Sequence, residues 1–280
     1  MRFWTPKLLP FILLCCTLVS YGQGNRDQRS KEFGVGFGTF YYLGELNQKH
    51  FPQIDPGLHL SFRTNISRRI GFNFSFSQGK IQGADSLSDI AFNQNRNLHF
   101  QSKIQELSVV FEINYFDYQL GNKKYPISPY IYFGVSAFHF NPKASADGGG
   151  DLRELQTIGT EGQNLEGGSP YNLFNFAIPF GIGLRLNLVK KLGITVFAGM
   201  RRTYTDYLND VSGVYANPQD FAPEDRVFVD RSIDPAFEDG TNTGLQRGNP
   251  ENKDWYTHTG IMLSFKIQKK RNMCPAWYAN

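Results

Sequence analysis

The stretch Ile70-Gly71-Phe72-Asn73-Phe74-Ser75-Phe76-Ser77 decides the fold. Large apolar side chains occupy every second position, and glycine, asparagine and serine stand between them. Side chains alternate between the two faces of a β-strand, whereas a helix repeats its apolar positions every three or four residues. The stretch therefore predicts a strand with one apolar face and one polar face.

Seven further segments repeat this alternation. The eight predicted strands run over approximately 33–46, 58–63, 70–76, 106–115, 129–140, 176–188, 192–201 and 260–267. On the fourth strand, Glu106 and Glu112 share the polar face, which would be costly in lipid and therefore points to an enclosed interior. The fifth strand is apolar on both faces, so its orientation stays open.

The connections between these strands are alternately long and short. The long ones follow the first, third, fifth and seventh strands, and the short ones contain Ser67-Arg68-Arg69, 121–128 and Val189-Lys190-Lys191. Bacterial outer-membrane barrels have short periplasmic turns and long external loops. The sequence predicts an all-β, eight-stranded antiparallel up-and-down transmembrane β-barrel with long extracellular loops and short periplasmic turns.

The composition fits an apolar outer surface. Aromatic residues make up 15% of the 280 residues, with 25 Phe and 14 Tyr, and charged residues make up 19%. A soluble domain has roughly 25% charged residues. The net charge of +4 is small, and no dense run of lysine and arginine supports binding to nucleic acid. We therefore expect no nucleic-acid partner.

The first 22 residues are typical of a cleaved signal peptide. Arg2 and Lys7 flank an apolar run over 8–19, and Ser20-Tyr21-Gly22 supplies small residues for cleavage. The run contains Cys15 and Cys16, so a lipoprotein is an alternative, although neither cysteine has the neighbours of a lipidation site. We expect a barrel domain over 23–280 that ends in a short basic tail and resides in the outer membrane.

A secreted soluble barrel such as a lipocalin is the main alternative fold. Its strands also alternate, but its apolar rows point inward, and periodicity does not say which face is inside. The unbroken aliphatic and aromatic rows, the small residues opposite them and the alternating loop lengths favour the membrane barrel.

Charged residues of the polar rows are predicted to pair across the lumen, because buried charges need partners. These residues are Arg63, Glu106, Glu112, Arg185 and Arg201. Such pairing would fill the narrow interior and leave no continuous pore.

Catalytic and metal-binding motifs receive little support. Gly34-Val35-Gly36-Phe37-Gly38 lies within a strand and opens no helix, so it does not fit a phosphate-binding loop. His59 and His258 are predicted to face inward, without a serine or aspartate spaced for a triad. The acidic residues of 209–253 match no calcium loop. We expect no enzyme activity, cofactor, metal or small-molecule substrate.

Basic residues gather on the short turns and after the last strand, and they would share the periplasmic rim. This predicted partner surface comprises Arg68, Arg69, Lys123, Lys124, Lys190, Lys191, Lys269, Lys270 and Arg271.

Four motifs carry a resemblance to a known family. They are 41–47 (YYLGELN), 159–163 (GTEGQ), 178–183 (IPFGIG) and 199–212 (GMRRTYTDYLNDVS). Together they resemble the PorG-like outer-membrane β-barrels of the Bacteroidetes, and in the last motif the residues singled out are Gly199, Arg201, Thr203, Thr205, Asp206, Tyr207 and Asp210. The resemblance implies a non-enzymatic component of the type IX secretion and gliding-motility machinery. It also implies association with a periplasmic ring made by a lipoprotein and its soluble partner.

Two other functions stay open. A ligand-binding or adhesive barrel would act through its external loops, and a lipid-modifying enzyme would depend on His59 or His258. Outer-membrane lipids are expected neighbours in every case.

Overall fold

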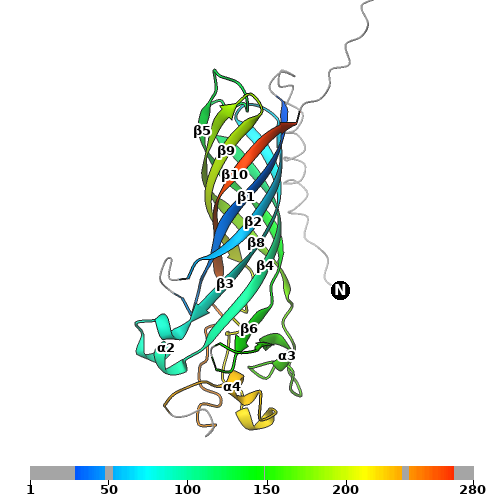
Figure 1. Cartoon of the computed structure of the whole chain (residues 1–280). Helices are drawn as coiled ribbons and strands as arrows, with labels where there is room; N and C mark the ends of the chain where they lie inside the picture. The colour runs from blue at the N-terminus through cyan, green and yellow to red at the C-terminus, as the bar shows by residue number, and fades with distance from the viewer. Residues whose placement is uncertain (1–28, 48–52, 148, 235–239, 268–280) are drawn as a thin grey trace, which may run out of the picture.

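The computed structural model describes residues 29–47, 53–147, 149–234 and 240–267. Within these residues a closed barrel is formed by β1 (Ser30–Leu43), β2 (Asp55–Asn65), β3 (Ile70–Ala84), β4 (His99–Asn114), β5 (Ile127–His139), β8 (Phe174–Val189), β9 (Leu192–Thr203) and β10 (Trp255–Ile267). Each strand pairs with the next in an antiparallel sense, and β1 pairs with β10 to close the sheet. The predicted eight-stranded up-and-down barrel is confirmed (Figure 1).

The apolar rows face outward and the polar rows face inward. Phe37 on β1 and Val135 on β5 are 71% and 65% exposed, whereas Arg63 on β2 is only 2% exposed. A soluble barrel would require the opposite arrangement, because its apolar rows form the core. The outward rows therefore form the apolar band that an outer-membrane barrel presents to hydrocarbon.

The orientation of β5, which the sequence left open, is set by the size and polarity of its side chains. Ile131, Phe133 and Val135 point outward, while Tyr130 and Tyr132 are buried inside the barrel. The tyrosines bring hydroxyl groups into the polar lumen, and the purely apolar residues meet the exterior. Amphipathic aromatic side chains suit such a boundary between apolar and polar surroundings.

β3 and β4 extend furthest beyond their predicted bounds. β3 continues to Ala84 and β4 begins at His99, so the hairpin extends beyond the apolar band and ends in η2 (Asp85–Leu87) and α2 (Ala91–Arg96). The periodicity continues through this extension, but its outward residues change from phenylalanine to glutamine and lysine. The sequence prediction missed these strand ends because it relied on apolar outward residues, which the extension lacks.

The long connections fold together at one end, which we call the loop end (Figure 1). They contain η2 and α2, then β6 (Pro142–Ser145), β7 (Leu152–Glu154), α3 (Leu155–Ile158), η3 (Pro218–Asp220) and α4 (Arg226–Val229). β6 pairs with β4 beyond the end of β5, and β7 pairs with β6. The loop end is therefore joined to the barrel sheet itself.

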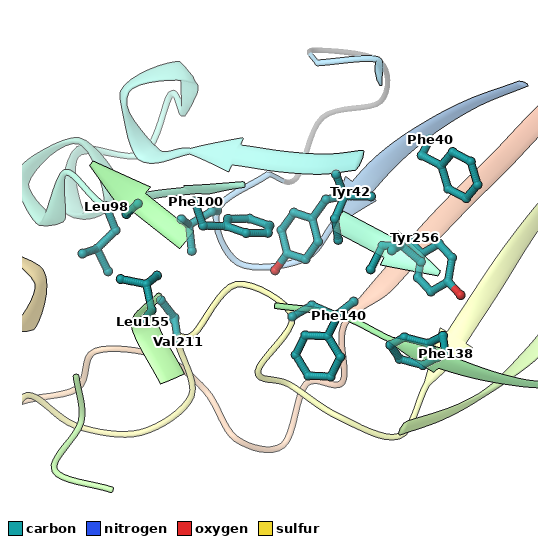
Figure 2. Close-up of a cluster of buried hydrophobic side chains, with 14 of the residues drawn as sticks. Phe40, Tyr42, Leu98, Phe100, Phe138, Phe140, Leu155, Val211 and Tyr256 are labelled. Carbon is teal, nitrogen blue, oxygen red and sulfur yellow. The ribbon is translucent and has the colours of Figure 1, made fainter. Parts of the chain in front are cut away.

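An apolar core fills the loop end. Phe40, Tyr42 and Tyr256 come from the barrel strands, and Phe140 and Val211 come from the connections (Figure 2). All five are buried, and the cluster continues from the part of the lumen nearest the loop end into the loops. Gly79 makes room for this core, because a Cβ atom there would lie 2.2 Å from the Phe40 ring.

The opposite end, which we call the turn end, carries the short connections. The connection over 115–126 is more than a simple turn, because Tyr118 and Leu120 are buried. The Lys266 ammonium donates to the Leu120 carbonyl oxygen at 3.0 Å, which ties this connection to β10. Residues 115–126 therefore cover the lumen at the turn end.

No helix among the residues described above is long and apolar enough to cross a membrane. The predicted signal peptide over 1–22 and the basic tail with Lys269, Lys270 and Arg271 lie outside the described residues.

Candidate functional site

The first ionic cluster of the lumen lies toward the turn end and is centred on Glu112. Its carboxylate lies 2.6 Å from Arg63 Nε and 2.6 Å from Arg185 Nη2. Arg63 also lies 3.0 Å from Glu32, and Asn73 donates to Glu112 at 3.1 Å. All these groups are buried, so each charge depends on its partners for the solvation that water no longer provides.

The second ionic cluster lies toward the loop end and is centred on Glu106. Arg201 Nε lies 3.2 Å from the Glu106 carboxylate, and the Tyr256 hydroxyl donates to it at 2.5 Å. His258 Nδ1 lies 3.2 Å from Arg201 Nη2. The structure therefore divides the five charged residues singled out in the sequence between two clusters rather than one network.

An apolar and aromatic layer separates the two ionic clusters. It consists of Val110, Tyr130, Tyr132, Phe197 and Met262. The Arg185 guanidinium lies over the Tyr130 ring at 3.7 Å, so the layer also packs against the Glu112 cluster. Gly199 leaves space for this layer, because a Cβ atom there would lie 1.9 Å from the Tyr132 hydroxyl. Side chains thus fill the lumen, and the expected absence of conductance stays a prediction.

The two histidines that motivated the enzyme alternative are both buried in the lumen. The rings of His59 and His258 lie 5.1 Å apart, and His258 stacks on Phe40 at 4.2 Å. His59 Nδ1 lies 2.8 Å from the Ser77 hydroxyl, and Ser77 is also fully buried. A nucleophile and base must reach substrate, and this pair lies among packed side chains.

Polar side chains from all four long connections meet in one network at the loop end. We call this network the loop-end hub. It comprises Tyr42, Glu45, Asp85, Arg96, Thr160, Glu161, Tyr171, Asp206, Asn209, Asp210, Ser212, Arg247 and Asp254.

The first part of the hub joins β1 to the last connection. The Tyr42 hydroxyl donates to Asp254 at 2.6 Å and accepts from the Asn209 amide at 2.9 Å. Asp254 also accepts the Leu208 backbone N–H at 3.0 Å, and the Thr203 hydroxyl donates to the Asp254 carbonyl at 2.7 Å. These bonds fix the point at which the chain leaves β9 and returns to β10.

The second part joins the third and fourth connections. Arg247 lies 3.0 Å from Glu161 and donates to the Asp210 carbonyl at 2.6 Å. Glu161 accepts the backbone N–H groups of Ser212 and Gly213, both at 2.9 Å. Asp210 has a φ of 63°, and its carboxylate accepts from Thr160 and from Tyr171. These hydrogen bonds offset the free-energy cost of the left-handed backbone conformation of Asp210, which residues other than glycine seldom adopt.

The third part joins the β3–β4 hairpin to the same network. Arg96 makes two bonds to the Asp85 carboxylate, each of 2.8 Å. The remaining guanidinium nitrogen donates to the Arg247 carbonyl at 2.6 Å. Paired arginine–carboxylate bonds of this kind are both strong and geometrically specific. Arg96 therefore locks the hairpin against the last connection.

Burial raises the pKa of three carboxyl groups of the hub. It raises the pKa of Glu45 from 4.5 to about 7, although the bond from the Asn249 backbone N–H opposes the shift. It raises the pKa of Asp210 from 3.8 to about 6, against the attraction of Arg247. Burial also raises the pKa of Asp254 well above its usual range. The protonation of the hub therefore changes near neutral pH.

The motif residues of 199–212 divide between the lumen and the hub. Gly199 and Arg201 lie on β9 inside the barrel, and Thr203 ends that strand. Beyond it, the structure places Thr205, Asp206, Tyr207 and Asp210 in or beside the hub. The Tyr207 ring stacks on Tyr171 at 4.4 Å. Residues from the motifs 41–47 and 159–163 contact this segment, so three distant parts of the sequence meet here.

The basic residues of the short turns share the turn end but differ in their partners. Asp117 lies 2.8 Å from Arg69 and 3.7 Å from Arg68, which partly neutralises both. Lys123, Lys124, Lys190 and Lys191 are exposed and form no ion pair within the described part of the chain. These lysines are the strongest positive feature of the described turn end.

The acidic last connection does not gather into a metal site in the ranges that the structure describes, where no group of three possible ligands is found. Asp225 pairs with Arg153 at 2.9 Å, and Asp230 accepts from Ser232 and Asn242. Glu238 and Asp239 lie outside the described residues.

A closed eight-stranded barrel with an apolar exterior and an ion-paired lumen defines a small outer-membrane β-barrel. Residues 7–223 match the model of a family described as a domain of unknown function, DUF6089, and the chain belongs to this family. No curated protein matches the sequence.

Several solved barrels are similar in outline. Ail, the attachment invasion locus protein of Yersinia pestis, is 10% identical with a TM-score of 0.40, over 86% of this chain and 99% of that one. Neisserial surface protein A is 8% identical with a TM-score of 0.42, over 85% and 99%. The N-terminal barrel domain of Pseudomonas aeruginosa OprF is 10% identical with a TM-score of 0.35, over 85% and 99%.

Proposed function

We propose that this barrel is a non-enzymatic outer-membrane component of the type IX protein secretion and gliding machinery, in which it anchors or positions the periplasmic ring. The observation that carries the proposal is the exposed group of Lys123, Lys124, Lys190 and Lys191 at the turn end. Its proposed partners are the ring lipoprotein and the soluble ring protein. The motif resemblance implies the identity of that ring, and the exposure of these lysines supports their choice as the contact surface.

The filled lumen supports a role in binding rather than transport. Two ionic clusters with an aromatic layer between them occupy the interior. The loop end is covered by its own apolar core, and the turn end is covered by Tyr118 and Leu120. A partner therefore meets the outside of the barrel or one of its ends.

The orientation follows the usual arrangement of such barrels, with long loops outside the cell and short turns in the periplasm. Under this arrangement the four lysines face the periplasm. Lys269, Lys270 and Arg271, which lie outside the described residues, follow β10 in the sequence, and the sequence prediction assigns them to the same surface. Clustered exposed charges of one sign steer and select a partner of opposite charge.

Charge reversal tests this surface. A variant with Lys123, Lys124, Lys190 and Lys191 each changed to Glu should lower the ring lipoprotein recovered with the barrel by about tenfold or more, because attraction becomes repulsion. The matched control changes the same four lysines to Arg, which keeps their positive charge. Insertion is checked for both by the difference in gel mobility between heated and unheated samples. Unchanged recovery with the turn-end variant would reject the surface.

A second candidate, a ligand-binding or adhesive barrel, is favoured by an exposed apolar patch at the loop end. Leu87, Phe92 and Ile233 are 48%, 54% and 65% exposed, and the Ile233 backbone N–H donates to the Asn95 carbonyl at 3.0 Å, which joins the patch to α2. Exposed apolar patches often mark interaction sites. Gene deletion separates the two candidates: loss of secreted cargo favours the secretion role, and loss of surface attachment alone favours adhesion.

A further inference from the structure

The outward side chains of the β3–β4 hairpin change from apolar to polar and basic toward the loop end. On β3 the outward residues change from Phe74 and Phe76 to Gln78 and Lys80. On β4 they change from Leu107 to Gln105 and Lys103. Four residues of tilted strand cover roughly 10 Å of height above the apolar band. The lysines therefore lie at the level of the lipid headgroups.

Lys80 and Lys103 are directly opposite each other in the β3–β4 register. Side chains at opposed positions of an antiparallel pair lie close together, and like charges placed there are destabilising. Lys80 has a partner, since its ammonium lies 3.1 Å from Asp55 Oδ1. Lys103 is exposed and forms no ion pair with any residue of the described ranges. An anion held between the two lysines would relieve their repulsion.

A third lysine extends this basic site onto the neighbouring strand. Lys143 on β6 is opposite Gln101, two residues along β4 from Lys103. It lies 2.7 Å from Glu154, so the three lysines and the two carboxylates of Asp55 and Glu154 leave the site with a net positive charge. The positive groups are thus spread over three strands, which suits a headgroup with more than one anionic group.

The three lysines line a groove that also has an apolar side. The groove has a volume of about 680 Å³, and its lining includes Phe37 and Leu58 from the apolar band as well as Lys80, Lys103 and Lys143. Phe37 is the most exposed apolar residue of β1. A ligand that fills this groove needs an apolar chain and an anionic head joined in one molecule.

We propose that this groove binds a phosphorylated glycolipid of the outer leaflet. An acyl chain packs on Phe37 and Leu58, one phosphate lies between Lys80 and Lys103, and a second anionic group faces Lys143. Phosphorylated glycolipids are the main amphiphiles of this leaflet, and lysine binds phosphate as a compact charge. The site depends on the loop end facing outward and is independent of any periplasmic ring.

Binding of diphosphorylated lipid A to the full-length barrel, purified in detergent and measured by native mass spectrometry, tests the site. The variant K80Q/K103Q should bind roughly thirtyfold more weakly, because each lysine near an anionic lipid surface contributes a factor of about five. K123Q/K124Q, which changes two lysines at the turn end, should bind as the unchanged protein does. K103Q alone, which leaves the Lys80–Asp55 pair in place, should give a smaller loss in the same direction.

Three results would overturn the proposal. One is equal affinity of K80Q/K103Q and the unchanged barrel for diphosphorylated lipid A. Another is equal affinity of the barrel for lipid A and its dephosphorylated form, which would remove the role of phosphate. The third is equal affinity for phosphatidylglycerol, which would assign the groove to anionic phospholipid. Recovery of the periplasmic ring lipoprotein is a separate measurement, so this site and the proposed function can fail independently.

Discussion

The two ends of the barrel are both covered, but by different kinds of structure. At the loop end, four long connections share an apolar core and the loop-end hub, so they form a folded unit beyond the strands. At the turn end, residues 115–126 insert Tyr118 and Leu120 into the mouth of the barrel and leave charged residues outside. Long connections can be ordered only if they bury apolar surface and satisfy their polar groups among themselves.

Because the two ends are built differently, we expect substitutions at each end to affect unfolding differently. The Glu112 cluster near the turn end links β1, β2, β4 and β8. Loss of one of its charges therefore destabilises the barrel as a whole. The hub holds connections that pack beyond the barrel, and these can open while the strands stay paired. We therefore expect global effects from the turn-end side of the lumen and local effects from the hub.

The largest effect is expected for Glu112→Ala, because it leaves Arg63 and Arg185 buried without their shared carboxylate. Loss of one partner of a buried ion pair costs about 3–5 kcal/mol. Urea unfolding of the barrel in lipid vesicles, followed by gel mobility without heating, would measure the change in the free energy of unfolding. The control Asp117→Ala removes an exposed ion pair at the same end and should cost under about 1 kcal/mol. Similar costs for both variants would contradict the global role of the cluster.

An intermediate effect is expected for Asp254→Ala in the hub. The change leaves the Tyr42 hydroxyl and the Leu208 backbone N–H without their acceptor, at a cost of about 1–3 kcal/mol. Hydrogen exchange should show faster opening of 204–213 and of 44–47, with the barrel strands still protected. The matched change Asp220→Ala in the same connection, where the side chain is exposed, should leave exchange unchanged. Equal loss of protection in the strands would show that the hub and barrel unfold as one unit.

The strands and their two faces could be predicted because the alternation of apolar and polar residues is local. Ile70 to Phe76 and Leu107 to Ile113 each separate an apolar face from a polar face within a few residues. The ends of β3 and β4 were underestimated, because the outward row becomes polar where the strands leave the apolar band. Predictions from apolar periodicity thus end at the edge of the hydrocarbon rather than at the end of the strand.

The hub could not be predicted, because its partners are far apart in the sequence. Tyr42 and Asp254 are separated by 212 positions, and Arg96 and Arg247 by 151. A sequence pattern identifies polar residues in loops but not which loops meet. The connection over 115–126 did carry a signal, since Tyr118 and Leu120 are unusually apolar for an exposed turn, and it could have indicated a buried segment.

The smallest effect, and the one that separates the ends most sharply, is a pH dependence confined to the loop end. The pKa of Glu45 is raised from 4.5 to about 7, and that of Asp210 from 3.8 to about 6. At a pH between the ordinary and the raised pKa of each group, the folded hub binds more protons than the unfolded chain does. The stabilisation is therefore complete below about pH 4 and is lost as the pH rises toward 7. Hydrogen exchange, corrected for its intrinsic pH dependence, should show falling protection of the hub from pH 5 to 7.5. Glu45→Gln should remove the part of this fall above about pH 6, whereas Glu166→Gln at an exposed position should not. Protection that rises with pH, or an equal fall in Glu45→Gln, would contradict the role of Glu45.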